Sequence, residues 1–198
     1  MINLANYVPA NSLQYCIDLW HMHRFQLKIT HSRKTKLGDY RYFHREKRHL
    51  ITLNNDLNIY SFLITYLHEL AHLVVKESYR RRFPPHGKQW KLAFIHLMNP
   101  VLNNQVFPDD ILSPLKDYME NPMASTNSHM PLLLALKNYD HRDDDATFLY
   151  EIERDINFSL NGRIFKKLTD KRTRVLCQDL RNGKKYLISK MAEVKPMV

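Results

Sequence analysis

Glycine and cysteine are both scarce in this chain of 198 residues, which contains four glycines and two cysteines. This scarcity argues against a glycine-rich phosphate loop and against a dinucleotide-binding fingerprint, and the sequence contains neither motif. The cysteines, Cys16 and Cys177, are too far apart to form a CxxC zinc knuckle. A chain of this size needs no disulfide to fold, so we expect two reduced and buried thiols.

Long apolar runs are also missing. No stretch approaches the roughly 20 apolar residues that a membrane span needs. The N-terminal stretch MINLANYVPANSLQ has neither the basic start nor the apolar segment of a signal peptide. We therefore expect a soluble, cytoplasmic protein with no membrane partner. Hydrophobic residues still make up 44% of the chain, which is enough for a packed core.

The first 100 residues combine helical and strand-like patterns. Helices are expected from an Asn11 or Ser12 cap to about Arg24, from an Asp56 cap to about Tyr79, and from about Lys88 to Met98. Alternating residues predict one strand over 25–30 and two more around the basic stretch RYFHREKRH. This order of elements favours an α+β fold.

Residues 100–145 look less regular, because they are interrupted by Pro108, Pro114, Pro122 and Pro131. Only residues 130–139 are predicted to form a helix there. The acidic run DHRDDD, residues 140–145, is typical of a linker. We therefore expect one domain over residues 1–140, with a proline-rich extension from about residue 100, and a second domain over 146–198.

The second domain has a different pattern from the first. FLYEIE, INFSL, RIFKKL, RVLCQDL and KYLISK predict short strands. Asn161-Gly162 and Asn182-Gly183 predict type I′ hairpin turns, because both central positions of that turn need a positive φ. A small antiparallel sheet or barrel would close these strands without exposed edges. No catalytic constellation is evident in it.

The central motif lies in YLHELAHLVV, residues 66–75. His68, Glu69 and His72 spell HExxH, and residues four apart on a helix project from one face. The two imidazoles can therefore bind one zinc ion, and Glu69 can reach a water at another coordination position. Apolar residues cover nearly every other side of this helix, and buried ionisable groups are costly unless paired or metal-bound. The alternative is a pair of core histidines hydrogen-bonded to carbonyls.

A catalytic zinc needs a third protein ligand. The best candidate is His86 in HGKQW, which follows a Pro84-Pro85 break that lets the chain fold back over the metal. Gly87 permits a tight backbone there, and Trp90 can anchor the next helix. Glu77 points about 140° away from His72 on the same helix, so it is the weaker choice. The remaining alternatives for the third ligand are His44, His49 and His96.

HELAH at residues 68–72, followed by HGKQW at 86–90, resembles the SprT-like domain, the minimal zincin shared by bacterial SprT proteins and the Spartan DNA–protein crosslink proteases. The resemblance covers about residues 10–100. It implies a minimal zincin-like helix–sheet–helix metalloprotease core with His68, His72 and His86 on one zinc ion and Glu69 as the general base. Many SprT proteins end in a four-cysteine zinc ribbon, which two distant cysteines cannot build. The β-rich tail takes its place here.

Basic residues outnumber acidic ones by 30 to 20, for a net charge of +10, which is compatible with a polyanionic partner. The predicted nucleic-acid contacts are Arg80, Arg81, Arg82, Lys166, Lys167, Arg172, Arg174, Lys184 and Lys185. The first three lie between the zinc helix and His86, where bound DNA would lie beside the cleavage site. A solvated charged face is the alternative for each cluster.

These patterns favour a zinc metallopeptidase of SprT type acting on DNA-associated or DNA-crosslinked proteins, with a protein substrate and DNA as partners. The alternative is a nucleic-acid-binding module with a structural zinc and no protease activity. A water at the fourth zinc position favours the enzyme, whereas a fourth protein ligand favours the module. The third hypothesis is a catalytically inactive interaction protein that keeps the zincin fold. The intact Glu69 argues against this hypothesis.

Overall fold

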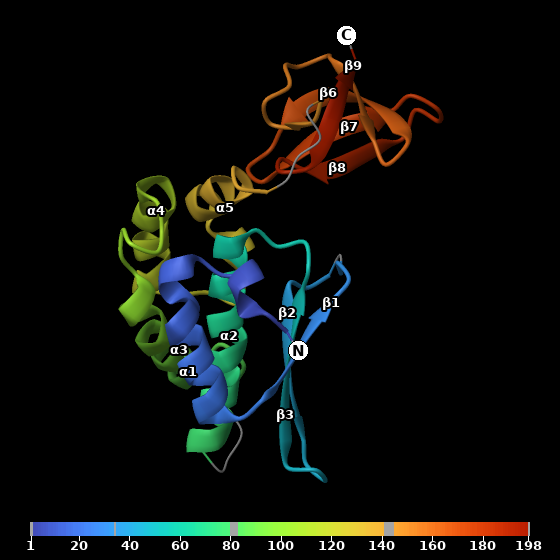
Figure 1. Ribbon diagram of the computed structural model, residues 1–198. Coiled ribbons are helices and arrows are strands. Elements are labelled where there is room, and N and C mark those ends of the chain that lie inside the picture. The colour runs from blue at the N-terminus through green and yellow to red at the C-terminus, as the bar shows by residue number, and fades with distance from the viewer. Residues whose placement is uncertain (1, 34, 80–82, 141–144, 198) are drawn as a thin grey trace. The chain divides into compact units, whose positions relative to one another are not determined.

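The computed structural model describes residues 2–33, 35–79, 83–140 and 145–197. The fold is mixed α+β, as the sequence predicts (Figure 1). The chain folds into two compact units, Met1–Asp140 and His141–Val198. None of the described helices has the length and apolar character needed to cross a lipid bilayer.

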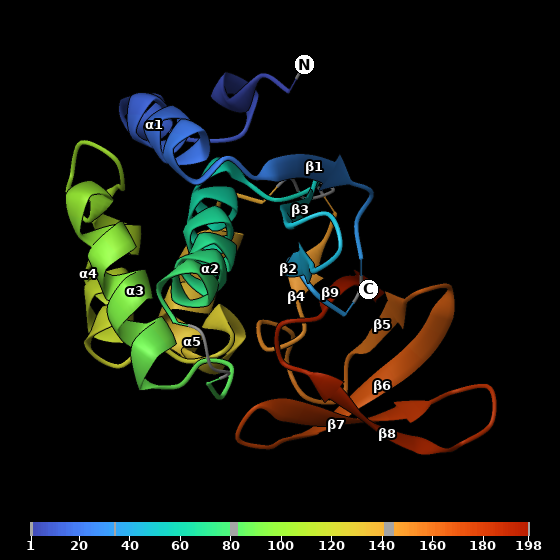
Figure 2. The same cartoon turned by 90° about the horizontal axis from the view of Figure 1, so that it is seen from below.

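The first unit contains five described helices, one of them much longer than the others. They are α1 (Leu13–His23), α2 (Ile59–Ser78), α3 (Lys88–Met98), α4 (Asp109–Glu120) and α5 (Met130–Lys137). Short 3-10 turns lie before α1 at Leu4–Asn6 and Ala10–Ser12, after α3 at Asn99–Val101 and before α5 at Thr126–Ser128. Arg24 follows α1, and its left-handed backbone turns the chain toward the first strand. Helix α2 packs against α3 on one side and against the sheet on the other (Figure 2).

The first unit contains a three-stranded sheet. Its strands β1 (Gln26–Thr30), β2 (Gly38–Phe43) and β3 (Arg48–Asn54) are ordered β1-β3-β2. Strand β3 lies in the middle, parallel to β1 and antiparallel to β2. Strand β2 is therefore an edge strand, and it packs directly against α2.

Helix α2 is the core of the first unit, and it begins later than predicted. Phe62, Leu63 and Leu67 on this helix are fully buried. Its cap is Asn58, whose side chain accepts hydrogen bonds from two backbone N–H groups of the first turn. The prediction of an Asp56 cap was wrong, because Asp56 lies two residues too early to reach those groups.

Helix α4 was not predicted from the sequence, because Pro114 was expected to break any helix there. The helix runs through Pro114. A proline removes one backbone hydrogen bond, but α4 buries a full apolar face made by Ile111, Leu112, Leu115, Tyr118 and Met119. Burial of that face outweighs the lost bond.

The second unit is a six-stranded antiparallel sheet. Its strands are β4 (Thr147–Phe148), β5 (Asn157–Leu160), β6 (Arg163–Asp170), β7 (Arg174–Asp179), β8 (Lys185–Ser189) and β9 (Glu193–Met197), in the order β4-β9-β5-β6-β7-β8. Phe158, Phe165, Val175 and Cys177 form its buried core with neighbouring apolar residues. Strand β9 was not predicted. It contains Pro196 and pairs with both β4 and β5.

The two Asn-Gly pairs differ in conformation. Asn161 and Gly162 have φ of 51° and 72°, which confirms the predicted type I′ turn between β5 and β6. At the second pair only Gly183 has a positive φ, of 67°. The prediction of a second type I′ turn was therefore wrong. A longer loop forms there, closed by a hydrogen bond from the Gly183 N–H to the Asp179 carbonyl.

Candidate metal centre

Three histidines from two segments of the first unit converge on one point. His68 and His72 lie one turn apart on α2, and His86 precedes α3. Nε2 of His86 lies 3.1 Å from Nε2 of His68 and 3.1 Å from Nε2 of His72. One ligand atom from each of the three lies within 4.8 Å of the others, which is close enough to hold a metal ion.

A tight turn places His86. The Gly87 N–H donates to the Pro84 carbonyl at 3.1 Å, and a Cβ at Gly87 would lie 3.0 Å from the same oxygen. The left-handed residue of this turn is His86 itself, with a φ of 59°. Left-handed backbone is uncommon for residues other than glycine. The turn thus aims the imidazole of His86 back toward α2.

Trp90 packs against all three histidines. Its ring centroid lies 4.6 Å from that of His68, 4.6 Å from that of His86 and 5.6 Å from that of His72. Its Nε1–H donates to the His68 carbonyl at 3.3 Å, and its side chain is buried in the core. Trp90 therefore joins α3 to α2, as the sequence predicts, and it restricts the imidazole rings.

Burial keeps the imidazoles neutral. It lowers the pKa of His68 to about 3, with a further decrease from the neighbouring His72 and His86. It lowers the pKa of His72 to about 4, with His86 contributing, and it lowers the pKa of His86 as well. A neutral imidazole has the free lone pair that a metal ion needs.

Glu69 lies beside this cluster and is also buried, with 7% of its surface exposed. Burial raises the pKa of Glu69 to about 8, with the nearby Asp39 adding to the increase and a hydrogen bond from the Tyr40 backbone opposing it. The edge strand approaches Glu69 closely at Gly38. A Cβ there would lie 2.8 Å from both Cγ and Oε1 of Glu69. Only a glycine fits this contact without displacement.

The histidines and Glu69 line one open cavity of about 520 Å³. One wall comes from residues 35–40, which are the end of the β1–β2 loop and the start of β2. Ala124, Ser125 and Thr126, between α4 and α5, also line it. The four residues that the sequence singled out as a catalytic set are therefore brought together at a solvent-accessible site.

The alternative candidates for the third ligand make other contacts. Glu77 pairs with Nδ1 of His23 at 2.8 Å, and Nδ1 of His49 bonds the hydroxyl of Tyr40 at 2.9 Å. His44 packs edge-on against Tyr42, and His96 is exposed on α3. None of these joins the three-histidine group within the described residues.

Tyr40 is a cavity residue that sequence reasoning missed. Tyr66 on α2 donates to the Cys16 carbonyl inside the core, and Tyr79, directly after α2, is exposed. The Tyr40 ring instead lies parallel to that of His72, with centroids 6.5 Å apart. The alternation in DYRYF indicates a strand, but not that this strand faces the HExxH helix.

The predicted nucleic-acid contacts separate into three groups. Arg80, Arg81 and Arg82 lie outside the described residues. In the second unit, the exposed members are Arg172, Arg174, Lys184 and Lys185, while Lys166 is half-buried and pairs with Asp155 at 3.0 Å. Lys167 is 3% exposed and donates to the carbonyls of Leu149, Tyr150 and Ile152. Its burial removes Lys167 from any surface interface.

Comparison of the chain with protein-family models, with curated proteins and with solved structures found no match. The function is therefore inferred from the site itself.

Proposed function

We propose that the chain is a zinc-dependent peptidase of SprT type that acts on DNA-associated or DNA-crosslinked proteins. The observation that carries this proposal is the convergence of three neutral imidazoles with a buried glutamate in one open cavity. Three protein nitrogen ligands and room for a further group are typical of catalytic rather than structural zinc.

The ligand geometry suits zinc. Tetrahedral zinc with Zn–N bonds of about 2.0–2.1 Å separates two ligand nitrogens by roughly 3.3 Å. Nε2 of His86 lies 3.1 Å from Nε2 of each of the other two histidines, so a small outward shift would accommodate the ion. His68 and His72 also come from consecutive turns of a rigid, buried helix, which favours a fixed coordination geometry.

Peptide hydrolysis then follows from the residues around the ion. Zinc, when bound, supplies a Lewis acid that polarises a carbonyl and acidifies water, and its charge favours ionised Glu69. The Glu69 carboxylate accepts the proton of the attacking water and later returns it to the leaving amine. The Tyr40 N–H favours the ionised form of that carboxylate, and Gly38 packs against its side chain. The α2 and Trp90 packing fixes the imidazoles relative to it.

The alternative of a structural zinc requires a fourth protein ligand. Within the described residues the metal-binding group has three members, all histidines. The neighbouring Glu69 is not a member of this group, and its side chain packs against Gly38 of β2. This arrangement favours the peptidase.

The DNA part of the proposal rests on the exposed cations of the second unit. Arg172 and Arg174 border β7, and Lys184 and Lys185 lie at the start of β8. Such side chains can neutralise backbone phosphates without reading sequence. A nucleic-acid surface would bring DNA-bound proteins to a peptidase on the same chain.

The peptidase is tested with Glu69→Gln in the full-length chain. We expect normal zinc content and a loss of hydrolysis on the order of 10²-fold or more, because glutamine cannot accept the proton. A DNA-binding protein is the substrate, with and without DNA present. Glu77→Gln on the same helix is the matched control and should cleave normally. Equal turnover by the Glu69 variant and the wild type would refute the proposal.

DNA binding is tested with the double variant Lys184→Gln, Lys185→Gln. For duplex DNA, the slope of log K against log salt should shrink by about 0.9 for each lost phosphate contact. Lys28→Gln, Lys116→Gln removes the same charge from exposed sites on the first unit. Identical slopes for the two double variants would exclude these lysines from DNA contact.

A further inference from the structure

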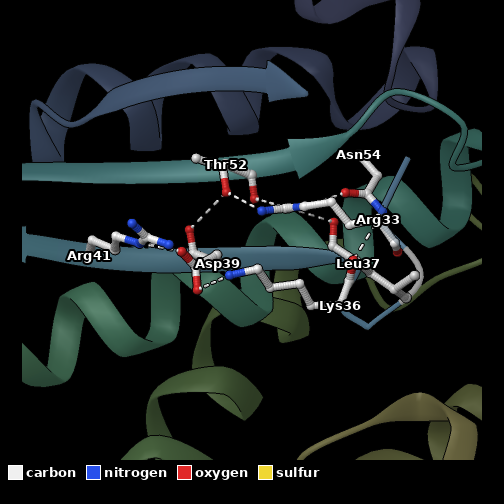
Figure 3. Close-up of polar contacts among 7 residues, drawn as sticks. All are labelled: Arg33, Lys36, Leu37, Asp39, Arg41, Thr52 and Asn54. Carbon is white, nitrogen blue, oxygen red and sulfur yellow. Dashed lines mark hydrogen bonds and ion pairs between the residues drawn. The ribbon is translucent and has the colours of Figure 1, made fainter. Parts of the chain in front are cut away.

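Arg33 holds the loop between β1 and β2 against the central strand (Figure 3). Its Nε donates to the Asn54 side-chain oxygen at 2.7 Å, and its Nη1 donates to the Thr52 hydroxyl at 3.0 Å. Its Nη2 reaches the carbonyls of Thr52 and Leu37 at 3.4 and 3.5 Å. Arg33 thus uses every nitrogen of its guanidinium on β3 and on its own loop.

Asn54 completes the attachment from β3. Its side-chain amide donates to the carbonyls of Lys36 at 3.0 Å and Arg33 at 3.4 Å, and its backbone N–H donates to the Leu37 carbonyl at 3.0 Å. The loop is therefore fixed immediately before Gly38, the first residue of β2. The neighbouring cations are used differently, since Lys36 and Arg41 both pair with Asp39.

The loop determines where the outer edge of β2 lies. The Leu37 carbonyl accepts a hydrogen bond from the Asn54 N–H of β3. Along an antiparallel strand, only every second residue directs its backbone N–H and C=O groups toward the neighbouring strand. The backbone N–H and C=O groups of Asp39 therefore point toward β3, while the N–H of Tyr40 points away from β3. That N–H points toward the Glu69 carboxylate and favours its ionised form. Two positions before Tyr40, Gly38 makes the close contact with the Glu69 side chain.

We propose that Arg33 is a positioning residue for Glu69: by fixing the β1–β2 loop to Thr52 and Asn54, it fixes the edge of β2 at Gly38 and Tyr40, which lies against the Glu69 side chain. This inference rests on the proposed peptidase for its catalytic consequence. The structural consequence, a Tyr40–Glu69 contact that depends on Arg33, stands without it.

The requirement is for the guanidinium fork and not for a positive charge alone. Lysine keeps the charge but presents a single ammonium, which cannot reach Thr52, Asn54 and Leu37 together. Arg33→Lys is therefore the informative variant. Arg48→Lys is its matched control, because Arg48 starts the same strand, β3, and contacts Gln26 and the ring of Phe43 instead of the cavity.

The test measures amide hydrogen exchange at Tyr40 in the full-length protein by NMR. Glu69→Ala gives the rate expected when the contact is lost. We expect Arg33→Lys to increase the Tyr40 rate by about tenfold or more toward that limit, as a local opening. Arg48→Lys should keep the wild-type rate. In zinc-loaded protein, Arg33→Lys should retain the metal and lower kcat about 10- to 100-fold, since small misplacements of a catalytic group have effects of this size.

Two results would overturn the proposal. One is a Tyr40 exchange rate in Arg33→Lys equal to that of Arg48→Lys. The other is faster exchange spread over β1, β2 and β3 with a lower Tm, which would make Arg33 a general support of the sheet. A wild-type protein that cleaves nothing would refute the peptidase, while the Tyr40 exchange rate would still decide the role of Arg33.

Discussion

Nε2 of His86 lies 3.1 Å from Nε2 of His72, although one residue belongs to a turn that follows two prolines and the other to the central helix. The contact closes the metal-binding group, because α2 by itself supplies only two imidazoles. It also depends on the left-handed backbone of His86 and on the packing of Trp90. The properties of the site therefore depend on this turn as much as on the HExxH helix.

Replacing His86 by alanine should sharply weaken zinc binding. We expect wild-type protein to hold one zinc ion, and the loss in affinity to exceed the roughly 100-fold that removal of an outer-shell partner can cost. Elemental analysis and chelator competition measure this. His96→Ala, on the exposed side of α3, is the control. Full zinc retention at wild-type affinity would remove His86 from the ligand set.

Gly38→Ala should destabilise the first unit and lower kcat while zinc remains bound. The new methyl group would lie 2.8 Å from Glu69 and from Cγ2 of Thr65, and overpacking of this kind costs about 1–3 kcal/mol. Denaturant unfolding measures the free energy of unfolding of each variant. Glu69→Ala should relieve part of the clash, so the double variant should lose less than the sum of the two single variants. Strictly additive losses in the free energy of unfolding would contradict the close approach of Gly38 to Glu69.

The metal-free protein should lose stability as the pH falls below about 6.5. Burial lowers the pKa of His68 to about 3 and that of His72 to about 4, from an ordinary value of 6.5. In this window the unfolded chain binds protons that the folded chain excludes, so folding is penalised. Glu69 opposes the change, because burial raises its pKa to about 8 and the folded state then binds the extra proton above pH 4.5.

The two histidines outweigh the single glutamate, so the net loss persists toward pH 4.5. Thermal unfolding of chelator-treated protein between pH 7 and 5 measures it. Glu69→Gln removes the opposing group and should steepen the decline. A Tm that is constant or rises on acidification in the Glu69 variant would show that these imidazoles are not held neutral.

Lys167→Met should destabilise the second unit far more than Lys166→Met. The buried ammonium of Lys167 bonds three carbonyls and pairs with Asp170 at 3.3 Å, and each carbonyl left without a donor costs about 1–3 kcal/mol. Lys166 makes only a surface ion pair with Asp155, and such pairs contribute about 0–1 kcal/mol. Alkylation of buried Cys177 reports the unfolding of this unit. Equal effects of the two variants would contradict the structural role of Lys167.

Local patterns were sufficient for much of the fold. The 3.6-residue and 2-residue periods predicted α1, α2, α3 and the three strands of the first sheet, and the Asn161-Gly162 pair predicted a hairpin turn. These features depend on neighbours along the chain. Where the outcome depended on distant packing, prediction failed: α4 forms through Pro114 because its apolar face is buried, and β9 forms because β4 and β5 accept it.

The candidate site divides in the same way. The sequence by itself determined that His68 and His72 share a helix face with Glu69 beside them, because four residues make about one helical turn. The sequence favoured His86 as the third ligand but left other candidates open, and only the tertiary structure brought His86 to the group and Gly38 against Glu69, on the edge that Arg33 fixes. It also decided that Lys167 is buried while Lys184 and Lys185 are exposed. Contacts between distant segments depend on how whole elements pack, and no short sequence window contains that information.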